Sequence, residues 1–510
     1  KLIADVEASE IITVNAPLVI DGNGHKLTST AGRAINVSGA DGVTIKNLTI
    51  DAKGERAINI IQGATNVTIE NVTATAANYA VNVAGSAANA VVTINDSNLT
   101  GLAVVNVAAK GVQIAVNNTK LTNVDANADE YYGAITIGYG ATDAKVTVTG
   151  GEIVAAGDSK KAIVFEPTAT VEGVDEVCYT VAMIGLAGYE TLEEAIADAK
   201  PGDVIDLIRD VTASQIITID KAITINGNGN TITSTAARAI NIDTTGKVVI
   251  NGLTINAGER AVNIINQAAT VELNGVTATA KNNAVMIATT AGAAKLTIND
   301  SNLTGLAVVS VYGEGADVAI KNTNITNVDA NKNENYGAIT VGDTAENAKV
   351  TVTGGNITVA DDSKKAYVFA PTATVEGVDE IGYIVAMIGD AGYDSLEEAI
   401  ADAKSGQTIE LLRDVTTSKI ITVNKAITIN GNGNTITSTA TRGINVDGAN
   451  GATIKNLIIE ASGERAINVI NGATNVTIEN VTATAANYAV NLASSAANAV
   501  VTIADSDLTG

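Results

Sequence analysis

Short stretches in which apolar and polar residues alternate recur along the chain, separated by residues typical of turns. Residues 34–37, Ala-Ile-Asn-Val, are followed by similar stretches at 57–60 and 80–83, so the pattern returns every 22 to 24 residues. Alternation with a period of two predicts half-buried β-strands, and frequent Gly, Asn, Asp and Ser argue against helices. Two or three short strands in each such unit predict the coil of a parallel β-helix, whose coils stack about 4.8 Å apart.

A second, longer repeat divides the chain into modules. Gly54-Glu55-Arg56 returns as Gly258-Glu259-Arg260 and as Gly463-Glu464-Arg465, at offsets of 204 and 205 residues. Self-similarity at a fixed period indicates an all-β solenoid in which each unit is stabilised mainly by its neighbours. We predict three tandem modules, over residues 1–175, 176–380 and 381–510. The phase of the repeat leads us to expect that the first module lacks its start and that the third is incomplete.

One short helix is predicted near the start of the second module and another near the start of the third. Residues 191–200 place Leu192, Ala195 and Ile196 on one face, and Thr191 stands as the N-cap with Glu194 in a capping box. The copy of this segment spans residues 395–404. An uncovered end of a β-helix exposes strand edges that recruit other strands. We therefore expect this helix to cap or link the modules.

Asparagine recurs at equivalent places of successive coils. Asn36 and Asn59 each follow an apolar residue that points inward, so the alternation predicts an external row of amides. Asn47 and Asn71 are expected to form a second row at a bend between strands. Stacked amides can hydrogen-bond along the axis of the solenoid.

The composition limits the classes of function. A net charge of −24 argues against nucleic acid and anionic lipid as partners, because both require clustered Lys and Arg. The hydrophobic fraction is 46% but aromatic residues make up only 3%, so aliphatic residues must form the core. The single cysteine, Cys178, excludes a disulfide within one chain, and the only histidine, His25, is not repeated, which argues against a catalytic thiol. We expect a secreted protein on a microbial surface, with no membrane insertion in this segment.

The residues around each module start resemble a known group of proteins. Residues 225–229 read Ile-Asn-Gly-Asn-Gly, which resembles the first coil of pectate-lyase-like right-handed β-helices. The Leu-Glu-Glu-Ala helix and residues 207–211, Leu-Ile-Arg-Asp-Val, are similar to the lead-in of repetitive modules in large bacterial cell-surface, adhesin-like proteins. The resemblance implies a right-handed parallel β-helix in an extracellular setting. The group contains polysaccharide lyases and hydrolases as well as adhesins, so the fold alone does not select a function.

The placement of arginine is the most unusual charged feature. Six of the eight arginines stand three residues before an asparagine of the first row, and the two in each module are 22 or 23 residues apart. Guanidiniums one coil apart repel each other unless an anion or an acidic side chain lies between them. One interpretation is an ion-paired row that includes Glu55, Glu259 and Glu464; the other is a strip that binds an anion or a uronate, extended by cation–π stacking on tyrosine. The residues of these predicted strips are Arg33, Arg56, Tyr79, Arg238, Arg260, Arg442, Arg465 and Tyr488.

One loop carries candidate ligands for Ca²⁺. Asp125, Asn127 and Asp129 match the first half of a calcium-binding loop, in which carboxylate and amide oxygens alternate. The sharp-turn glycine is absent, and Thr136 stands where a bidentate Glu would be needed. The alternative is a solvated loop before the next strand.

Cleavage of a polysaccharide would require acidic residues on neighbouring coils, but the strand positions carry Asn, Thr, Ala and Val. We therefore expect no catalytic residues, no required cofactor and no enzyme activity. The favoured interpretation is a structural protein that forms a fibre, stalk or adhesin shaft. Its expected partners are further copies or a continuation of the same chain, and cell-surface glycans. The alternatives are a carbohydrate-binding surface module that uses the Arg/Tyr strips and, ranked lower, an acidic-polysaccharide lyase or hydrolase.

Overall fold

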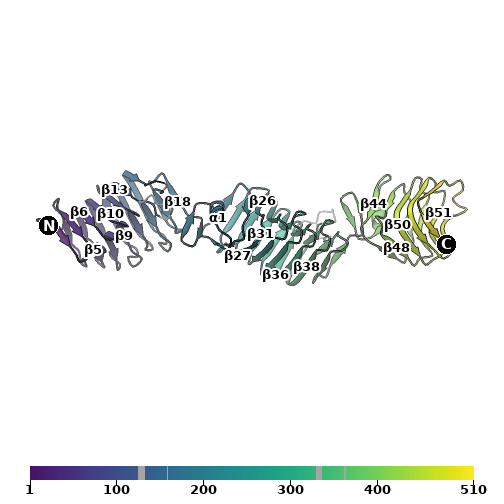
Figure 1. Cartoon of the computed structure of the whole chain (residues 1–510), viewed down its shortest axis with the longest axis horizontal. Coiled ribbons are helices and arrows are strands. Elements are labelled where there is room, and N and C mark those ends of the chain that lie inside the picture. The colour runs from purple at the N-terminus through teal and green to yellow at the C-terminus, as the bar shows by residue number, and fades with distance from the viewer. Residues whose placement is uncertain (125–131, 158, 329–335, 361–362) are drawn as a thin grey trace. The chain divides into compact units, whose positions relative to one another are not determined.

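The computed structural model describes residues 1–124, 132–157, 159–328, 336–360 and 363–510. Strands of successive coils pair in parallel, so the chain is a parallel β-helix, as the sequence predicts (Figure 1). The fold consists of two compact units, residues 1–211 with 225–230 and residues 212–224 with 231–510. The predicted module boundaries stay a prediction.

In the first unit, one sheet contains the strands that carry the arginine and asparagine rows. It has eight strands, one from each coil. Its members are β2 (Ile12–Val14), β5 (Arg33–Ser38), β7 (Arg56–Ile61), β9 (Tyr79–Val83), β12 (Val105–Val107), β14 (Ile135–Ile137), β16 (Ala162–Val164) and β18 (Val177–Tyr179). The opposite wall is a second parallel sheet, whose main path is β1 (Val6–Ala8), β4 (Lys26–Ser29), β6 (Thr44–Ala52), β8 (Val67–Thr75), β10 (Val91–Asn95), β13 (Gln113–Asn123), β15 (Lys145–Val154) and β17 (Thr170–Glu172).

The second unit repeats this arrangement. One eight-stranded sheet comprises β23 (Ile217–Ile219), β26 (Arg238–Ile242), β29 (Arg260–Ile264), β32 (Asn283–Ile287), β35 (Val309–Val311), β37 (Ile339–Val341), β39 (Ala366–Val368) and β41 (Ile381–Tyr383). A four-stranded sheet follows, with β46 (Ile421–Val423), β49 (Arg442–Asp447), β51 (Arg465–Ile470) and β53 (Tyr488–Leu492). The opposite wall includes β27 (Lys247–Asn251), β30 (Thr270–Asn274), β33 (Lys295–Asn299), β36 (Asp317–Asn327) and β38 (Lys349–Thr358).

The core is a stack of aliphatic side chains. Ile35, Ile58 and Val81 occupy one register position on β5, β7 and β9, and each is at most 1% exposed. Burying an aliphatic side chain of this size contributes about 1.5–3 kcal/mol. The core is therefore aliphatic, as the low aromatic content predicts. Every coil repeats this contribution, so neighbouring coils stabilise each other.

The first asparagine row forms the predicted ladder, but it is buried. Asn59 Nδ2 donates to Asn36 Oδ1 over 2.9 Å, and Asn82 Nδ2 donates to Asn59 Oδ1 over 2.7 Å. The sequence predicted an external row, yet Asn59 is 0% exposed. The row lies on the face opposite the aliphatic core, as the alternation requires.

The second row lies at the bend, as predicted. Asn47 and Asn71 adopt left-handed φ angles of 50° and 48°, and Asn71 Nδ2 donates to Asn47 Oδ1 over 2.9 Å. Gly252 and Gly275 take the equivalent places in the second unit, with φ angles of 55° and 61°. Asn and Gly are the residues that most readily adopt this conformation, which explains the exchange.

The two predicted helices are present and short. α1 (Leu192–Asp198) begins after Thr191, whose Oγ1 accepts a hydrogen bond from the Glu194 backbone N–H over 3.1 Å. α1 packs against β19 (Ala182–Ile184), β20 (Ala187–Tyr189) and β21 (Val204–Leu207), where β19 pairs antiparallel with both other strands. α2 (Leu396–Asp402) repeats this arrangement against β42 (Ala386–Ile388), β43 (Ala391–Tyr393) and β44 (Thr408–Leu411). Within the described residues, neither helix is long and apolar enough to cross a membrane.

Candidate binding strips and module joints

The paired arginines lie on adjacent strands, as their spacing predicts. Three register pairs place them side by side, Arg33 with Arg56, Arg238 with Arg260 and Arg442 with Arg465. Strands of a sheet lie about 4.8 Å apart, so each pair places two positive charges close together at the N-terminal ends of two adjacent strands. The structure thus assembles the predicted strips, while ligand binding by them stays a prediction.

In the first strip, protein groups neutralise and cover the second arginine. Arg56 lies over the Tyr79 ring, with its Cζ 5.6 Å from the ring centroid, and its Nη2 lies 3.8 Å from Glu55 Oε2. In the third strip, Arg465 repeats these contacts with Tyr488 at 5.9 Å and with Glu464 at 3.7 Å. These two strips agree with the interpretation of an ion-paired, stacked row.

The middle strip differs from the other two. Asn283 stands in register with Arg260, where Tyr79 and Tyr488 stand in the other strips. Its Nδ2 is turned to the Ala307 carbonyl at 2.7 Å and to Ser310 Oγ at 2.9 Å. Among the described residues, neither Arg238 nor Arg260 forms an ion pair or a cation–π contact. Among the described residues, no carboxylate oxygen lies within 4.0 Å of the Arg260 guanidinium, although Glu259 precedes Arg260 as Glu55 precedes Arg56.

A groove of about 680 Å³ lies over this middle strip. Its lining includes both arginines, Asn263 of the buried amide row, Tyr312 and Tyr336. Burial, followed by the proximity of Tyr336, raises the pKa of Tyr312 above its usual range. The sequence prediction included neither tyrosine. Tyr312 replaces Ala108 of the first unit, and Tyr336, the counterpart of Tyr132, stands far from the arginines in the sequence.

The two arginines outside the strips tie modules together. Arg209 donates from Nε to the Thr180 carbonyl at 2.9 Å, from Nη1 to Pro167 at 2.7 Å and from Nη2 to Glu166 at 2.8 Å. Its Cζ lies 5.3 Å from the centroid of the Tyr179 ring. A single guanidinium thus joins the last coil of one predicted module to the linker and the first strand of the next predicted module.

Arg413 repeats this joint. Its Nε donates to the Ile384 carbonyl at 3.1 Å and its Nη1 to Pro371 at 2.6 Å, and its Cζ lies 5.3 Å from the Tyr383 ring centroid. Burial lowers the pKa of Arg209 and of Arg413 below the usual range. The recurrence of both Arg and Tyr at an offset of 204 was the available sequence signal, but the acceptors are backbone carbonyls that leave no pattern in the sequence.

The predicted calcium ligands Asp125, Asn127 and Asp129 lie outside the described residues. Within the described ranges, no group of three or more His, Cys, Asp or Glu is placed to hold a metal ion. Calcium at this loop therefore stays a prediction from the sequence.

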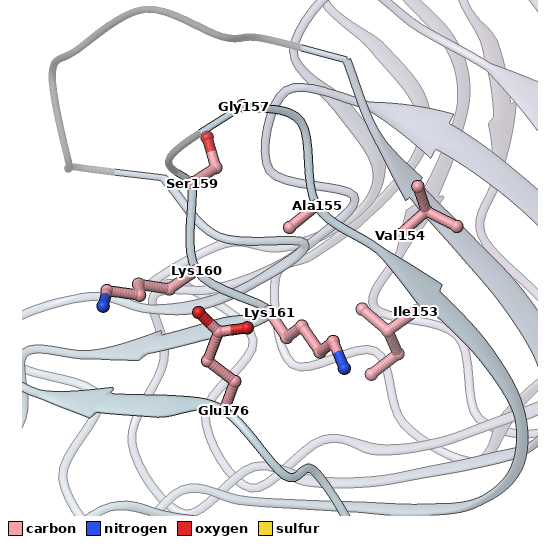
Figure 2. Close-up of a pocket in the computed structure, with 8 residues that line it drawn as sticks. All are labelled: Ile153, Val154, Ala155, Gly157, Ser159, Lys160, Lys161 and Glu176. Atoms are coloured by element: carbon pink, nitrogen blue, oxygen red, sulfur yellow. The ribbon is translucent and has the colours of Figure 1, made fainter.

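A second pocket, of about 600 Å³, is lined by Lys160, Lys161 and Glu176 beside the end of β15 (Figure 2). Lys161 Nζ lies 2.8 Å from Asp175 Oδ1, and Lys160 Nζ lies 3.9 Å from Glu190 Oε2. Since both ammonium groups have acidic partners, this pocket presents less unbalanced charge than the groove at Arg260.

Cys178 is a core residue. It is 5% exposed and packs with Ile163 and Phe165. Burial, followed by the nearby Glu190 carboxylate, raises the pKa of the thiol to about 12. The group is therefore a neutral thiol at neutral pH and a poor nucleophile.

Comparison with known proteins finds similarity in structure but none in sequence. No protein-family model matches the chain, and no curated protein matches its sequence. The chain is similar to the solved structure of a mutant of the PL6 family alginate lyase AlyGC, with 10% identity and a TM-score of 0.24, over 99% of this chain and 97% of that one. The parallel pairing of strands from coil to coil makes the chain a parallel β-helix. The matching structure is that of a polysaccharide lyase, one of the protein classes that the residues at the module starts resemble.

The same comparison contradicts the prediction that the chain is not an enzyme, because the matching protein is a lyase. The prediction relied on the strand positions of neighbouring coils, which carry Asn, Thr, Ala and Val where paired acidic residues would be needed. Chemistry that uses groups other than paired carboxylates leaves no such signal, so the absence of acidic residues could not exclude catalysis.

Proposed function

We propose that this chain is a repetitive spacer, or shaft, of a secreted or cell-surface assembly. The observation that supports this most is the module joint, in which one buried arginine links the last coil of a module to the start of the next. The joint occurs twice with the same chemistry, at Arg209 and at Arg413. A connection that is rebuilt at each repeat is expected where modules must hold a fixed order along an axis.

The chemistry of the coils supports the same role. The sheets run in register from coil to coil, and the buried amide ladder adds hydrogen bonds along the same direction. A net charge of −24 favours solubility and discourages lateral clumping of neighbouring shafts. The partners we propose are further copies or a continuation of the same chain.

Immunogold microscopy of the source cells, with an antibody against this chain, tests the proposal. We expect label outside the cell, on surface structures in which it recurs at regular intervals. Label confined to the cell interior would contradict the proposal.

Cleavage of an acidic polysaccharide is a second candidate function, and the middle groove favours it. A cation pair can neutralise a uronate carboxylate, and tyrosines beside it are groups able to transfer a proton. Alginate and polygalacturonate are the substrates to test, by the ultraviolet absorbance of unsaturated products. Turnover that Arg260→Ala abolishes while the fold is retained would support this function, and no turnover of either polymer would reject it.

A further inference from the structure

The three arginine strips are near-copies in sequence but differ in structure, and the difference points to one binding site. In the first and third strips a glutamate forms an ion pair with the second arginine and a tyrosine ring lies against its guanidinium. In the middle strip both contacts are absent among the described residues, and Asn283 replaces the tyrosine. The replacement leaves a cation pair beneath an open groove of about 680 Å³.

We propose that this groove binds a glycan carrying a tetrahedral oxyanion ester, a sulfate or a phosphate, at Arg238 and Arg260. Two guanidinium forks on adjacent strands offer several N–H donors at about 4.8 Å spacing. A sulfate or phosphate ester has three terminal oxygens, enough to accept from both forks at once, whereas a carboxylate has two. The anion would bridge the two arginines and remove their mutual repulsion.

The rest of the groove fits a sugar ring. Tyr312 and Tyr336 supply aromatic surface beside the cations, and Tyr336 is 40% exposed. Thr289, Thr290 and Asn282 add hydroxyl and amide groups along the same lining. Aromatic faces combined with a few polar groups that fix orientation are typical of small-ligand sites.

The local charge supports the assignment as well. The chain carries 55 acidic and 31 basic residues, so a cation pair without an acidic partner is an exception on this molecule. Long-range repulsion by the remaining surface weakens as salt rises, but so does the attraction of the cation pair for its ligand. Because the two effects oppose each other, binding is expected to be selective for ligands whose charge is concentrated at one point, which gain most from the adjacent cation pair.

Isothermal titration calorimetry on the full chain tests the proposal. The probes are a heparin-derived hexasaccharide, the same hexasaccharide after desulfation, a phosphorylated mannan oligosaccharide and a polygalacturonate oligosaccharide. We expect the sulfated or the phosphorylated probe to bind at least tenfold more tightly than the other two, and the stronger of the pair identifies the ester. Equal or tighter binding of polygalacturonate, or no binding of either ester, would overturn the proposal.

Two matched variants locate the site. Arg238→Ala with Arg260→Ala should weaken binding at least tenfold, whereas Arg33→Ala with Arg56→Ala, at the equivalent places of the first strip, should leave it unchanged. Circular dichroism and the melting temperature show whether each variant is folded, and Arg260→Lys, which keeps the charge, should retain part of the affinity. Equal losses in both double variants would overturn the assignment to the middle strip. The proposal is independent of the shaft function, which the imaging experiments test without any ligand.

Discussion

Arg413 lies over the ring of Tyr383, with its Cζ 5.3 Å from the ring centroid, while its guanidinium donates to carbonyls of the preceding coil. The contact joins residues that are 30 positions apart in the third predicted module, while the carbonyl of Pro371, to which the guanidinium donates, belongs to the second. The same pair recurs as Arg209 and Tyr179. It identifies a joint whose local stability should depend on a single side chain.

Arg413→Met should loosen this joint without unfolding the coils. Methionine keeps the apolar stem but removes charge-assisted hydrogen bonds, which contribute about 1.5–3 kcal/mol each. We expect the free energy of local opening to fall by about 2 kcal/mol, which corresponds to about 30-fold faster exchange. Hydrogen exchange at the Ile384 and Phe369 amides, which donate to Val368 and Val341, measures it.

Arg442→Met is the matched control, because Arg442 belongs to a strip and not to a joint. Exchange at Ile384 and Phe369 should be the same in this variant as in the unmodified chain. Unchanged exchange in Arg413→Met as well would show that the guanidinium does not hold the joint.

Removing one amide from the buried ladder should be costly. Asn59 is 0% exposed, donates to Asn36 and accepts from Asn82. Asn59→Ala leaves a buried acceptor on one neighbour and a buried donor on the other, and each unsatisfied group costs about 1–3 kcal/mol. Chemical denaturation should show a loss of about 2–4 kcal/mol in the free energy of unfolding of this region. Asn106→Ala, at a half-buried position, should lose less; an equal loss would show that burial does not set the cost.

At the bend positions, substitution by glycine should destabilise the chain less than substitution by alanine, which is the reverse of the usual order. Asn71 has a φ of 48°, a conformation that costs a residue with a Cβ about 1–2 kcal/mol and that glycine adopts freely. Asn71→Gly should therefore be less destabilising than Asn71→Ala, since glycine already occupies the equivalent position as Gly275. Melting temperatures of the two variants measure the order, and a more stable alanine variant would contradict the assigned backbone conformation.

Cys178 should make the first unit sensitive to alkaline pH. Its pKa is about 12 in the folded chain and 9.0 for a free thiol, so folding favours the protonated form. The stabilisation is fully present below pH 9 and is lost as the pH rises from about 9 toward 12. Unfolding monitored between these values should show a steeper loss of stability in the unmodified chain than in Cys178→Ala.

The rate at which a thiol-specific reagent modifies Cys178 provides a second measurement. At neutral pH the folded chain should react far more slowly than the denatured chain, because the buried thiol is protonated. Rapid modification of the folded chain would contradict the burial of this residue.

The sequence was sufficient to predict the stacking of the coils but not the contacts at the module joints. The register of Ile35 with Ile58 follows from apolar residues that recur every 23 positions, so periodicity alone predicts the stacking. Burial of Asn59 could not be read from alternation, which predicts the face of a side chain but not what covers it. The contacts of Arg209 were hidden because they end on backbone carbonyls up to 45 residues away.

The candidate site was predicted in part for a related reason. The arginine pairs follow from one repeat, and the structure places them in register. The groove, however, depends on the differences between repeats, such as Asn283 in place of tyrosine and Tyr312 in place of alanine. The sequence does not show that these residues line one groove, because they come from different coils.

The most direct test of the shaft is electron microscopy of the purified chain. The sheets that carry the arginine rows contain eight, eight and four strands, and each coil advances about 4.8 Å. The account predicts rod-like particles with a length on the order of 100 Å, and an axial repeat of roughly 35–45 Å per module. Compact particles without this repeat would contradict it.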